Sequence, residues 1–298
     1  MSREPTSAEP PVIDVDNKLQ AHQQALIKLL KEFDRVCRSL SIPYVLFAGT
    51  MLGAVRHQGF IPWDDDLDVL MLREDYERFL LEAETVLDRK TFFLQKEFSE
   101  HWPMFFSKLR LNNTTCIEKF HPKDLLIHQG IYMDIFPCDR AADSNFGRKL
   151  QFLASKVVIA KSLDARGYDT DSKIKKLFMK VCKYLPAAPF IWYTKTGNKH
   201  SGMRHSFFAA ASCYEKNVYP ESYFTNTVDA DFEDGKYQIS ACFDNLLRQL
   251  YGDYMRIPLP EERTCKQHAI LIDTDRSYEE YLHYHDGMHF DVYTRSIR

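Results

Sequence analysis

Four aspartates within five positions constrain this chain more than any other feature of its sequence. They are Asp64, Asp65, Asp66 and Asp68. Like charges this close repel one another, so a fold keeps them where they stay hydrated, are partly protonated or bind cations. The cluster runs directly into the apolar residues 69–72, which have the composition of a buried strand. A cation site is therefore favoured over an acidic loop without a ligand.

The expected strand, residues 66–72, places two of these carboxylates on one face. Side chains alternate along a strand, so Asp66 and Asp68 point the same way with Cα atoms about 6–7 Å apart. Carboxylates at this spacing can bind one hard cation or a pair, and oxygen ligands without a thiolate pattern favour Mg²⁺ or Mn²⁺. Asp64 joins the same face if the strand begins early, whereas Asp65 points away. We therefore predict metal ligands at Asp64, Asp66 and Asp68.

A possible phosphate-binding turn precedes the acidic cluster. Residues 44–48 have the pattern of a buried strand, Gly49 and Thr50 interrupt it, and residues 51–57 can begin a helix. Free backbone N–H groups and the positive end of the helix dipole favour phosphate at such a junction, and Thr50 can cap the helix or donate its hydroxyl. Thr50 lies sixteen residues before Asp66. This spacing indicates that the Gly-Thr turn binds phosphates and that the following strand binds the metal ion associated with them.

Three further charged residues lie inside expected strands. In the strand 104–110, Lys108 and Arg110 point to one face. There they either neutralise a pyrophosphate or are ordinary exposed charges. In the apolar strand 131–137 the single carboxylate of Asp134 needs a partner, which a structural salt bridge would also supply.

Composition narrows the class of protein. The 298 residues are 45% hydrophobic, which is enough for one elaborated domain, and the net charge of −3 gives no reason to expect a nucleic-acid partner. We find no apolar run of about 18 residues and expect no membrane span. Seven scattered cysteines without a C-x-x-C pair fit reduced thiols in a cytoplasmic enzyme. We expect a disordered lead-in over residues 1–16 and one catalytic domain over residues 17–298.

Helical patterns account for much of the remaining chain. Residues 17–39 and 73–87 are expected to form helices, the second with solvated Arg and Glu side chains, and Asp139 is expected in a loop after Pro137. We interpret residues 144–215 as a helical insertion rich in lysine. Such helices can lie on a membrane surface, so peripheral contact with the inner face of the membrane is one possibility. Packing against the catalytic domain is the more ordinary behaviour of amphipathic helices.

The motifs together resemble a known family. A Gly-Thr turn followed by Asp-x-Asp is similar to the signature of the nucleotidyltransferase superfamily. The longer stretch AGTMLGAVRHQGFIPWDDDLDVLM, residues 48–71, resembles the LicD-type phosphotransferases. These include bacterial phosphocholine transferases, with fukutin and fukutin-related protein as relatives. Two later stretches, GIYMDIFPCD at 130–139 and LYGDYMRIPLPEER at 250–263, fit the same family.

The resemblance implies a fold and a set of site residues. The fold is α/β (α+β), a nucleotidyltransferase-like mixed sheet flanked by helices, with a helical insertion. Asp134 is implied to be a third carboxylate beside Asp66 and Asp68, either as a metal ligand or as the base for the attacking hydroxyl. The residues expected to bind the phosphates of the donor are Gly49, Thr50, Arg56, Lys108 and Arg110.

The implied reaction is metal-dependent transfer of phosphocholine from CDP-choline to a hydroxyl of a cell-surface glycan, with release of CMP. The glycan would be lipopolysaccharide, teichoic acid or a capsule precursor, which can be lipid-linked. Mg²⁺ or Mn²⁺ would bridge the pyrophosphate of the donor. Three alternatives stay open: ribitol-phosphate or glycerol-phosphate transfer from a CDP-polyol, nucleotidyl transfer from a nucleoside triphosphate, and a non-catalytic binding protein with a vestigial site.

Overall fold

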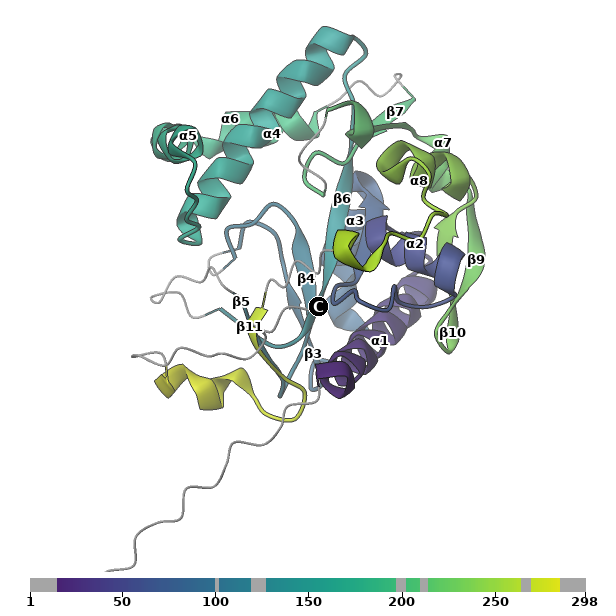
Figure 1. Ribbon diagram of the computed structural model, residues 1–298. Helices are drawn as coiled ribbons and strands as arrows, with labels where there is room; N and C mark the ends of the chain where they lie inside the picture. The colour runs from purple at the N-terminus through teal and green to yellow at the C-terminus, as the bar shows by residue number, and fades with distance from the viewer. Residues whose placement is uncertain are drawn as a thin grey trace, which may run out of the picture.

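The protein is described by a computed structural model over residues 15–99, 102–118, 127–196, 202–209, 214–263 and 269–284. Figure 1 shows strands at the centre, helices α1 to α3 on one side of them, and α4 to α6 grouped on another. The predicted α/β fold with a mixed sheet and flanking helices is confirmed. The predicted lead-in, residues 1–16, lies outside the described residues apart from its last two, which begin α1 (Val15–Leu40).

A mixed sheet organises the fold, in the order β1-β2-β6-β4-β3, and β7 and β8 continue it beside the end of β6. Strands β2 and β6 run parallel, whereas the other neighbours in this sheet are antiparallel. The strands are β1 (Val45–Leu46), β2 (Asp68–Leu72), β3 (Phe92–Gln95), β4 (Ser107–Leu111), β6 (Tyr132–Arg140), β7 (Met203–His205) and β8 (Val218–Pro220). The strand synthesised last among β1, β2, β3, β4 and β6 thus lies between β2 and β4.

Helices α1, α2 (Ala48–His57) and α3 (Arg73–Glu82) contribute to the main core with the sheet. Helix α1 shows why the sequence folds this way, because its apolar residues recur every three or four positions and face inward. Its fully buried residues include Leu26, Leu29, Leu30, Phe33, Val36 and Cys37. Burying each large apolar side chain stabilises the fold by about 1.5–3 kcal/mol.

Smaller elements surround this core. The strand pairs are β5 (Thr115–Glu118) with β11 (Ala269–Asp273), and β9 (Thr227–Phe232) with β10 (Gly235–Ser240). The remaining helices are α4 (Asn145–Ala165), α5 (Lys173–Lys183), α6 (Ala187–Lys195), α7 (Ser222–Thr225) and α8 (Phe243–Tyr251), with short 3₁₀ turns at Ala83–Thr85, Glu215–Asn217, Pro260–Glu262 and Tyr278–Tyr284. Among the described residues of the predicted insertion 144–215, the last α-helix ends at Lys195, and β7 pairs with the sheet.

Strand β6 extends further than the sequence suggests, and the prediction of a loop at Asp139 is wrong. Pro137 does not end the strand because it lies between the pairing of Ile135 with β4 and the pairing of Asp139 with β7. The N–H that proline lacks is therefore not needed for a ladder bond at that point. Asp139 is a fully buried strand residue.

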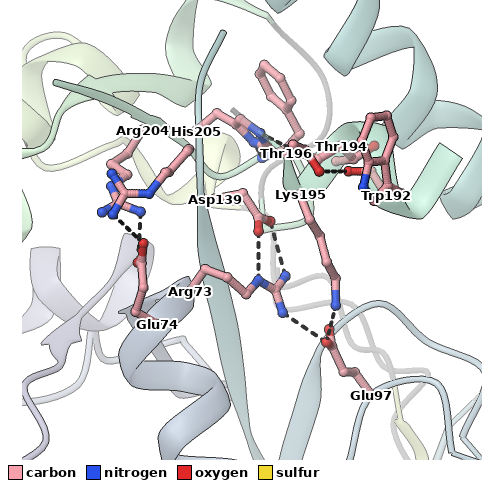
Figure 2. Close-up of polar contacts among 12 residues, drawn as sticks. Arg73, Glu74, Glu97, Asp139, Trp192, Thr194, Lys195, Thr196, Arg204 and His205 are labelled. Atoms are coloured by element: carbon pink, nitrogen blue, oxygen red, sulfur yellow. Dashed lines mark hydrogen bonds and ion pairs between the residues drawn. The ribbon is translucent and has the colours of Figure 1, made fainter. Parts of the chain in front are cut away.

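The prediction that the charged side chains of α3 are solvated is also wrong at its start. Arg73 is buried and donates to both carboxylate oxygens of Asp139, at 2.7 and 3.1 Å. Figure 2 shows how the network continues: Arg73 and Lys195 of α6 both donate to Glu97, at 2.9 and 2.7 Å. A buried guanidinium needs such carboxylates, because an unpaired buried charge is strongly destabilising. This network, called the arginine network below, ties α3, β6 and α6 together.

Two further observations bear on the sequence predictions. Among the described residues, no helix has both the length and the apolar character needed to cross a bilayer. The cysteines within the described residues are free thiols, namely Cys37, Cys116, Cys138, Cys182 and Cys242. The prediction of reduced cysteines therefore holds for these five.

Candidate active site

The parallel pairing of β2 and β6 brings two predicted site residues side by side. Asp68 is the register partner of Asp134, so their side chains lie on the same face of the sheet. The N–H of Asp134 donates to the carbonyl of Leu67 at 2.9 Å, which fixes the register at this point. Two carboxylates that are 66 residues apart in sequence thus meet at the start of the only parallel pair in this sheet, as far as the chain is described.

The Gly-Thr segment lies against the same carboxylates, although not as the turn that was predicted. Helix α2 already begins at Ala48, whose φ of +48° makes the sharp change of direction, so Gly49 and Thr50 are in its first turn. Gly49 is required for close approach instead: a Cβ there would lie 2.8 Å from Oδ2 of Asp64 and 4.0 Å from Oδ1 of Asp66. The four predicted metal ligands and the start of α2 therefore form one site, which we call the acidic cluster.

Thr50 holds these two elements together. Its buried hydroxyl accepts a hydrogen bond from the N–H of Asp68 at 2.8 Å, and the N–H of Phe47 donates to the carbonyl of Asp68 at 2.9 Å. Thr50 is therefore not the N-cap of α2, which is Phe47 and has no side-chain cap. The first N–H groups of α2 lack intrahelical partners, so they remain suited to an anion.

Burial and mutual repulsion disfavour the ionised form of the carboxylates. Burial raises the pKa of Asp64 to about 6, and the charge of Asp65 adds to the shift. Burial likewise raises the pKa of Asp66 and of Asp68 well above the usual range, and the other carboxylates of the cluster raise both further. Among the described residues, neither the Asp66 nor the Asp68 carboxylate accepts a hydrogen bond. Without a bound cation, these carboxylates are therefore shifted toward the protonated form.

Lys108 provides the cluster with its nearest positive charge. Its Nζ lies 3.1 Å from Oδ1 of Asp134, 3.5 Å from Oε1 of Glu118 and 3.0 Å from the centre of the Tyr132 ring. Burial raises the pKa of Asp134, and Lys108 opposes this shift. Lys108 is itself only 1% exposed, so the alternative of an ordinary surface charge is wrong.

Arg110 is also buried but is held by internal partners. Its Nε donates to Gln95 at 2.7 Å and its Nη1 to the carbonyl of Gly130 at 2.8 Å. Its Nη2 lies 3.8 Å from Glu118, a carboxylate that sequence reasoning missed. Burial alone would raise the pKa of Glu118, but Lys108, Arg166 and Arg110 lower it to about 2. Arg110 therefore supports Glu118 in this structure, and its contact with a donor phosphate stays a prediction.

The acidic cluster fits a divalent cation by its chemistry. Its donors are carboxylate oxygens with raised pKa values, and a bound cation would remove the repulsion among them. As the side chains stand, no group of three or more His, Cys, Asp or Glu residues in the described part of the chain is arranged to hold a metal. Ion binding would therefore require side-chain rearrangement, in which Oδ1 of Asp134 would exchange its 3.1 Å contact with Nζ of Lys108 for the cation.

A cavity of about 400 Å³ is lined by Arg56 and by Trp63, the residue that precedes Asp64 in the sequence. Nη1 of Arg56 donates to the carbonyl of Tyr254 at 2.7 Å, so Arg56 supports the stretch 250–263. Tyr251 also lines this cavity. Its pKa is raised by burial and by the charges of the acidic cluster, so Tyr251 lies between the cavity and the acidic cluster. Sequence reasoning missed Arg263, whose guanidinium lies 4.4 Å from the Trp63 ring centre.

Comparisons with known proteins agree with this geometry. Residues 41–146 match the family described as LicD/FKTN/FKRP, nucleotidyltransferase domain. Over 266 residues the chain is 29% identical to the lipopolysaccharide cholinephosphotransferase LicD of Haemophilus influenzae, covering 84% of this chain and 96% of that protein. An uncharacterized protein of Rickettsia typhi is 46% identical over 55 residues, 18% of each chain. Another from Rickettsia prowazekii is 47% identical over 51 residues, 17% of this chain and 19% of that protein.

Proposed function

Because this chain belongs to the LicD-type family, we propose that it transfers phosphocholine from CDP-choline to a hydroxyl of a cell-surface glycan and releases CMP. The observation that carries the proposal is the register of Asp68 with Asp134 beside the start of α2. The Haemophilus influenzae relative is by name a lipopolysaccharide cholinephosphotransferase, which supports both the transferred group and the class of acceptor.

The acidic cluster is the proposed site of Mg²⁺ or Mn²⁺, which Asp66 and Asp68 would hold together with Asp64. A divalent cation neutralises the pyrophosphate of the donor. The uncapped N–H groups at the start of α2 stabilise phosphate oxygens through hydrogen bonds and the helix dipole. Thr50 fixes α2 against β2, so phosphate binding and the carboxylates keep one relative position.

Asp134 is the proposed base. A hydroxyl oxygen of the acceptor attacks the phosphorus of phosphocholine, the bond to the oxygen of CMP breaks, and the hydroxyl proton passes to a carboxylate oxygen of Asp134. The raised pKa of Asp134 makes this carboxylate a stronger base than an exposed one. Lys108 opposes that rise and so favours the ionised form of Asp134, which is the form that accepts a proton. Phosphoryl transfer depends mainly on such positioning and charge neutralisation.

The test is a nucleotide-release assay with three CDP donors. Purified protein is incubated with CDP-choline, CDP-ribitol or CDP-glycerol and a panel of glycan acceptors, with Mg²⁺, with Mn²⁺ or with EDTA. We expect CMP from CDP-choline only when a cation and an acceptor are present. Release of CMP from CDP-ribitol or CDP-glycerol instead would show that the donor is a CDP-polyol. Release of pyrophosphate from CTP would show that the protein is a nucleotidyltransferase.

A pair of variants tests whether activity depends on the acidic cluster or on any surface carboxylate. Asp68→Asn should abolish CMP release, whereas Asp231→Asn on β9, an exposed residue paired with Lys236, should retain it. Equal activity of wild-type protein in Mg²⁺ and in EDTA would contradict the metal-dependent mechanism. Normal turnover by Asp68→Asn would contradict the assigned site.

A further inference from the structure

Helix α5 carries an apolar stripe that the fold leaves uncovered. Four apolar residues recur at the i, i+3, i+4 and i+7 positions that normally face a core. They are Ile174, Leu177, Phe178 and Val181, with exposed fractions of 83, 64, 44 and 55%. The side of α5 that packs on α4 is narrow and contains the buried Met179 and Cys182 next to Ala160. The expectation that the helices of the insertion pack on the catalytic domain is therefore wrong for this face of α5.

The contrast with α1 shows that this exposure is unusual. Both helices have apolar residues at helical spacing, and α1 buries its stripe from Ala25 to Cys37. Single exposed apolar side chains are normal on proteins, but contiguous apolar patches mark surfaces that bind something else. The stripe on α5 therefore needs a partner.

Charge indicates what that partner is. Helix α5 has five lysines and no acidic residue, and residues 145–196 contain eleven Lys or Arg against three Asp, although the whole chain has a net charge of −3. Lys176 pairs with Asp169 and Lys183 lies 3.6 Å from Asp164. Within the described residues the other lysines of α5 have no acidic partner: they are Lys173, Lys175 and Lys180. A positive helix with an exposed apolar stripe complements an anionic bilayer.

Neighbouring helices present apolar side chains of the same kind. Phe146, Leu150 and Leu153 form an exposed i, i+4, i+7 row on α4, and Trp192 of α6 is 65% exposed. Figure 1 places α4, α5 and α6 together on one side of the molecule, with α5 outermost. Tryptophan favours the boundary between lipid headgroups and acyl chains. These residues widen the apolar surface beyond α5.

We propose that α5 lies flat on an anionic lipid bilayer, with its apolar stripe among the upper acyl-chain carbons and its lysines at the headgroup phosphates. Amphipathic helices of this type insert their apolar face about 5–10 Å into the boundary layer. The docked enzyme would meet a lipid-linked acceptor at the surface where that acceptor is held. Bilayer binding is independent of donor and metal, so failure of the proposed reaction would not affect it.

The experiment measures co-sedimentation of the full chain with vesicles. The vesicles are phosphatidylcholine alone, or phosphatidylcholine mixed with phosphatidylglycerol. We expect binding to the mixed vesicles, weaker binding to the neutral ones, and loss of binding as salt rises. Absence of binding to the mixed vesicles at low salt would overturn the proposal.

Two comparisons of variants test whether the apolar stripe and the lysines of α5 bind the bilayer. Leu177→Glu combined with Phe178→Glu should reduce vesicle partitioning at least about tenfold, because two inserted apolar side chains are lost. The matched control is Leu81→Glu on α3, which changes a residue that is 80% exposed outside the insertion and should bind like the wild type. Lys175→Glu with Lys180→Glu should reduce binding to anionic vesicles more than Lys236→Glu on β10.

The variants also distinguish other occupants of the stripe. Circular dichroism and thermal unfolding should show that each variant folds like the wild type, since the altered side chains are exposed. Equal vesicle binding by the stripe variant and Leu81→Glu would overturn the proposal. So would a dimer in analytical ultracentrifugation that the stripe variant dissociates while the wild type binds no vesicles, since a second copy would then cover α5.

Discussion

Strand β6 holds two carboxylates, five residues apart, whose surroundings act in opposite ways. At one end, burial raises the pKa of Asp134, which lies among the carboxylates of the acidic cluster with Lys108 as its nearest cation. At the other end, burial alone would raise the pKa of Asp139, but the bidentate contact with Arg73 lowers it. The arginine network contains its own balancing charges, whereas among the described residues only Asp134 of the acidic cluster forms an ion pair, with Lys108.

The difference separates a structural charge from a functional one. A buried ion pair with complete hydrogen bonding can hold elements together without any ligand. Buried carboxylates that repel one another destabilise the free protein, and such a cost is typical of sites that bind something of opposite charge. The comparison between the two ends of β6 therefore predicts which substitutions abolish activity and which weaken the fold.

The largest effect is expected for Asp68→Asn. A bound metal stabilises the transition state by several kcal/mol, so loss of a ligand should lower the rate about a thousandfold. Without divalent cations the same variant should melt at a higher temperature than wild type, because repulsion in the acidic cluster is reduced. CMP release and thermal unfolding in EDTA measure the two effects. If Asp68→Asn loses activity because it unfolds, Asp68 would be a structural residue like Asp139.

Asp139→Asn should have the opposite profile. The substitution removes one of the two carboxylates that neutralise the buried Arg73. This loss should lower the free energy of unfolding by about 3 kcal/mol. Turnover per folded molecule should stay close to wild type. Urea unfolding measures the stability, with Asp231→Asn as an exposed control that should cost less than about 1 kcal/mol. A loss of turnover without a loss of stability would place Asp139 in the active site.

Gly49→Ala should reduce activity about tenfold with little change in stability, because the new Cβ would displace the Asp64 carboxylate from a distance of 2.8 Å. The double variant Gly49→Ala with Asp64→Ala removes the clashing oxygen. It should be no less active than Asp64→Ala alone, which a double-mutant cycle of CMP release would show. Independent, multiplicative effects of the two changes would contradict the contact.

The smallest expected effect concerns pH. The pKa of Asp64 is about 6 in the folded protein and 3.8 is its ordinary value, so the folded state takes up the proton first as pH falls. In EDTA, this group should therefore stabilise the protein progressively between about pH 6 and pH 4, relative to its effect at neutral pH. The difference in melting temperature between wild type and Asp64→Asn should shrink over that range. A difference independent of pH would show that the pKa of Asp64 is not raised in the folded state.

The acidic cluster was largely predictable from sequence because its signals are local. The expected strands 66–72 and 131–137 contain Asp68 and Asp134, which β2 and β6 bring into register. The predicted start of the first strand was wrong, because β2 begins at Asp68 and Asp66 lies before it. The helix start was misplaced because the positive φ falls on Ala48, a residue type that rarely adopts it, and not on Gly49.

The arginine network was not predictable by the same means. Arg73 and Asp139 are 66 residues apart, and each has a local context that is typical of a surface residue. Lys108 and Arg110 were correctly placed on one face, but no local pattern shows that Trp102 and Tyr132 cover that face. The stripe of α5 was visible as periodicity, yet periodicity does not show what faces it.

The position of β6 also matters while the protein is being made. Strands β2 and β4 both need β6 as a neighbour, yet β6 leaves the ribosome after them. Until then the nascent chain presents two unpaired strand edges, which are templates for aggregation. A product terminated before Tyr132 keeps those edges permanently and should accumulate as insoluble protein. The arrangement that assembles the carboxylates late in synthesis also makes incomplete copies of this chain hazardous to the cell that produces them.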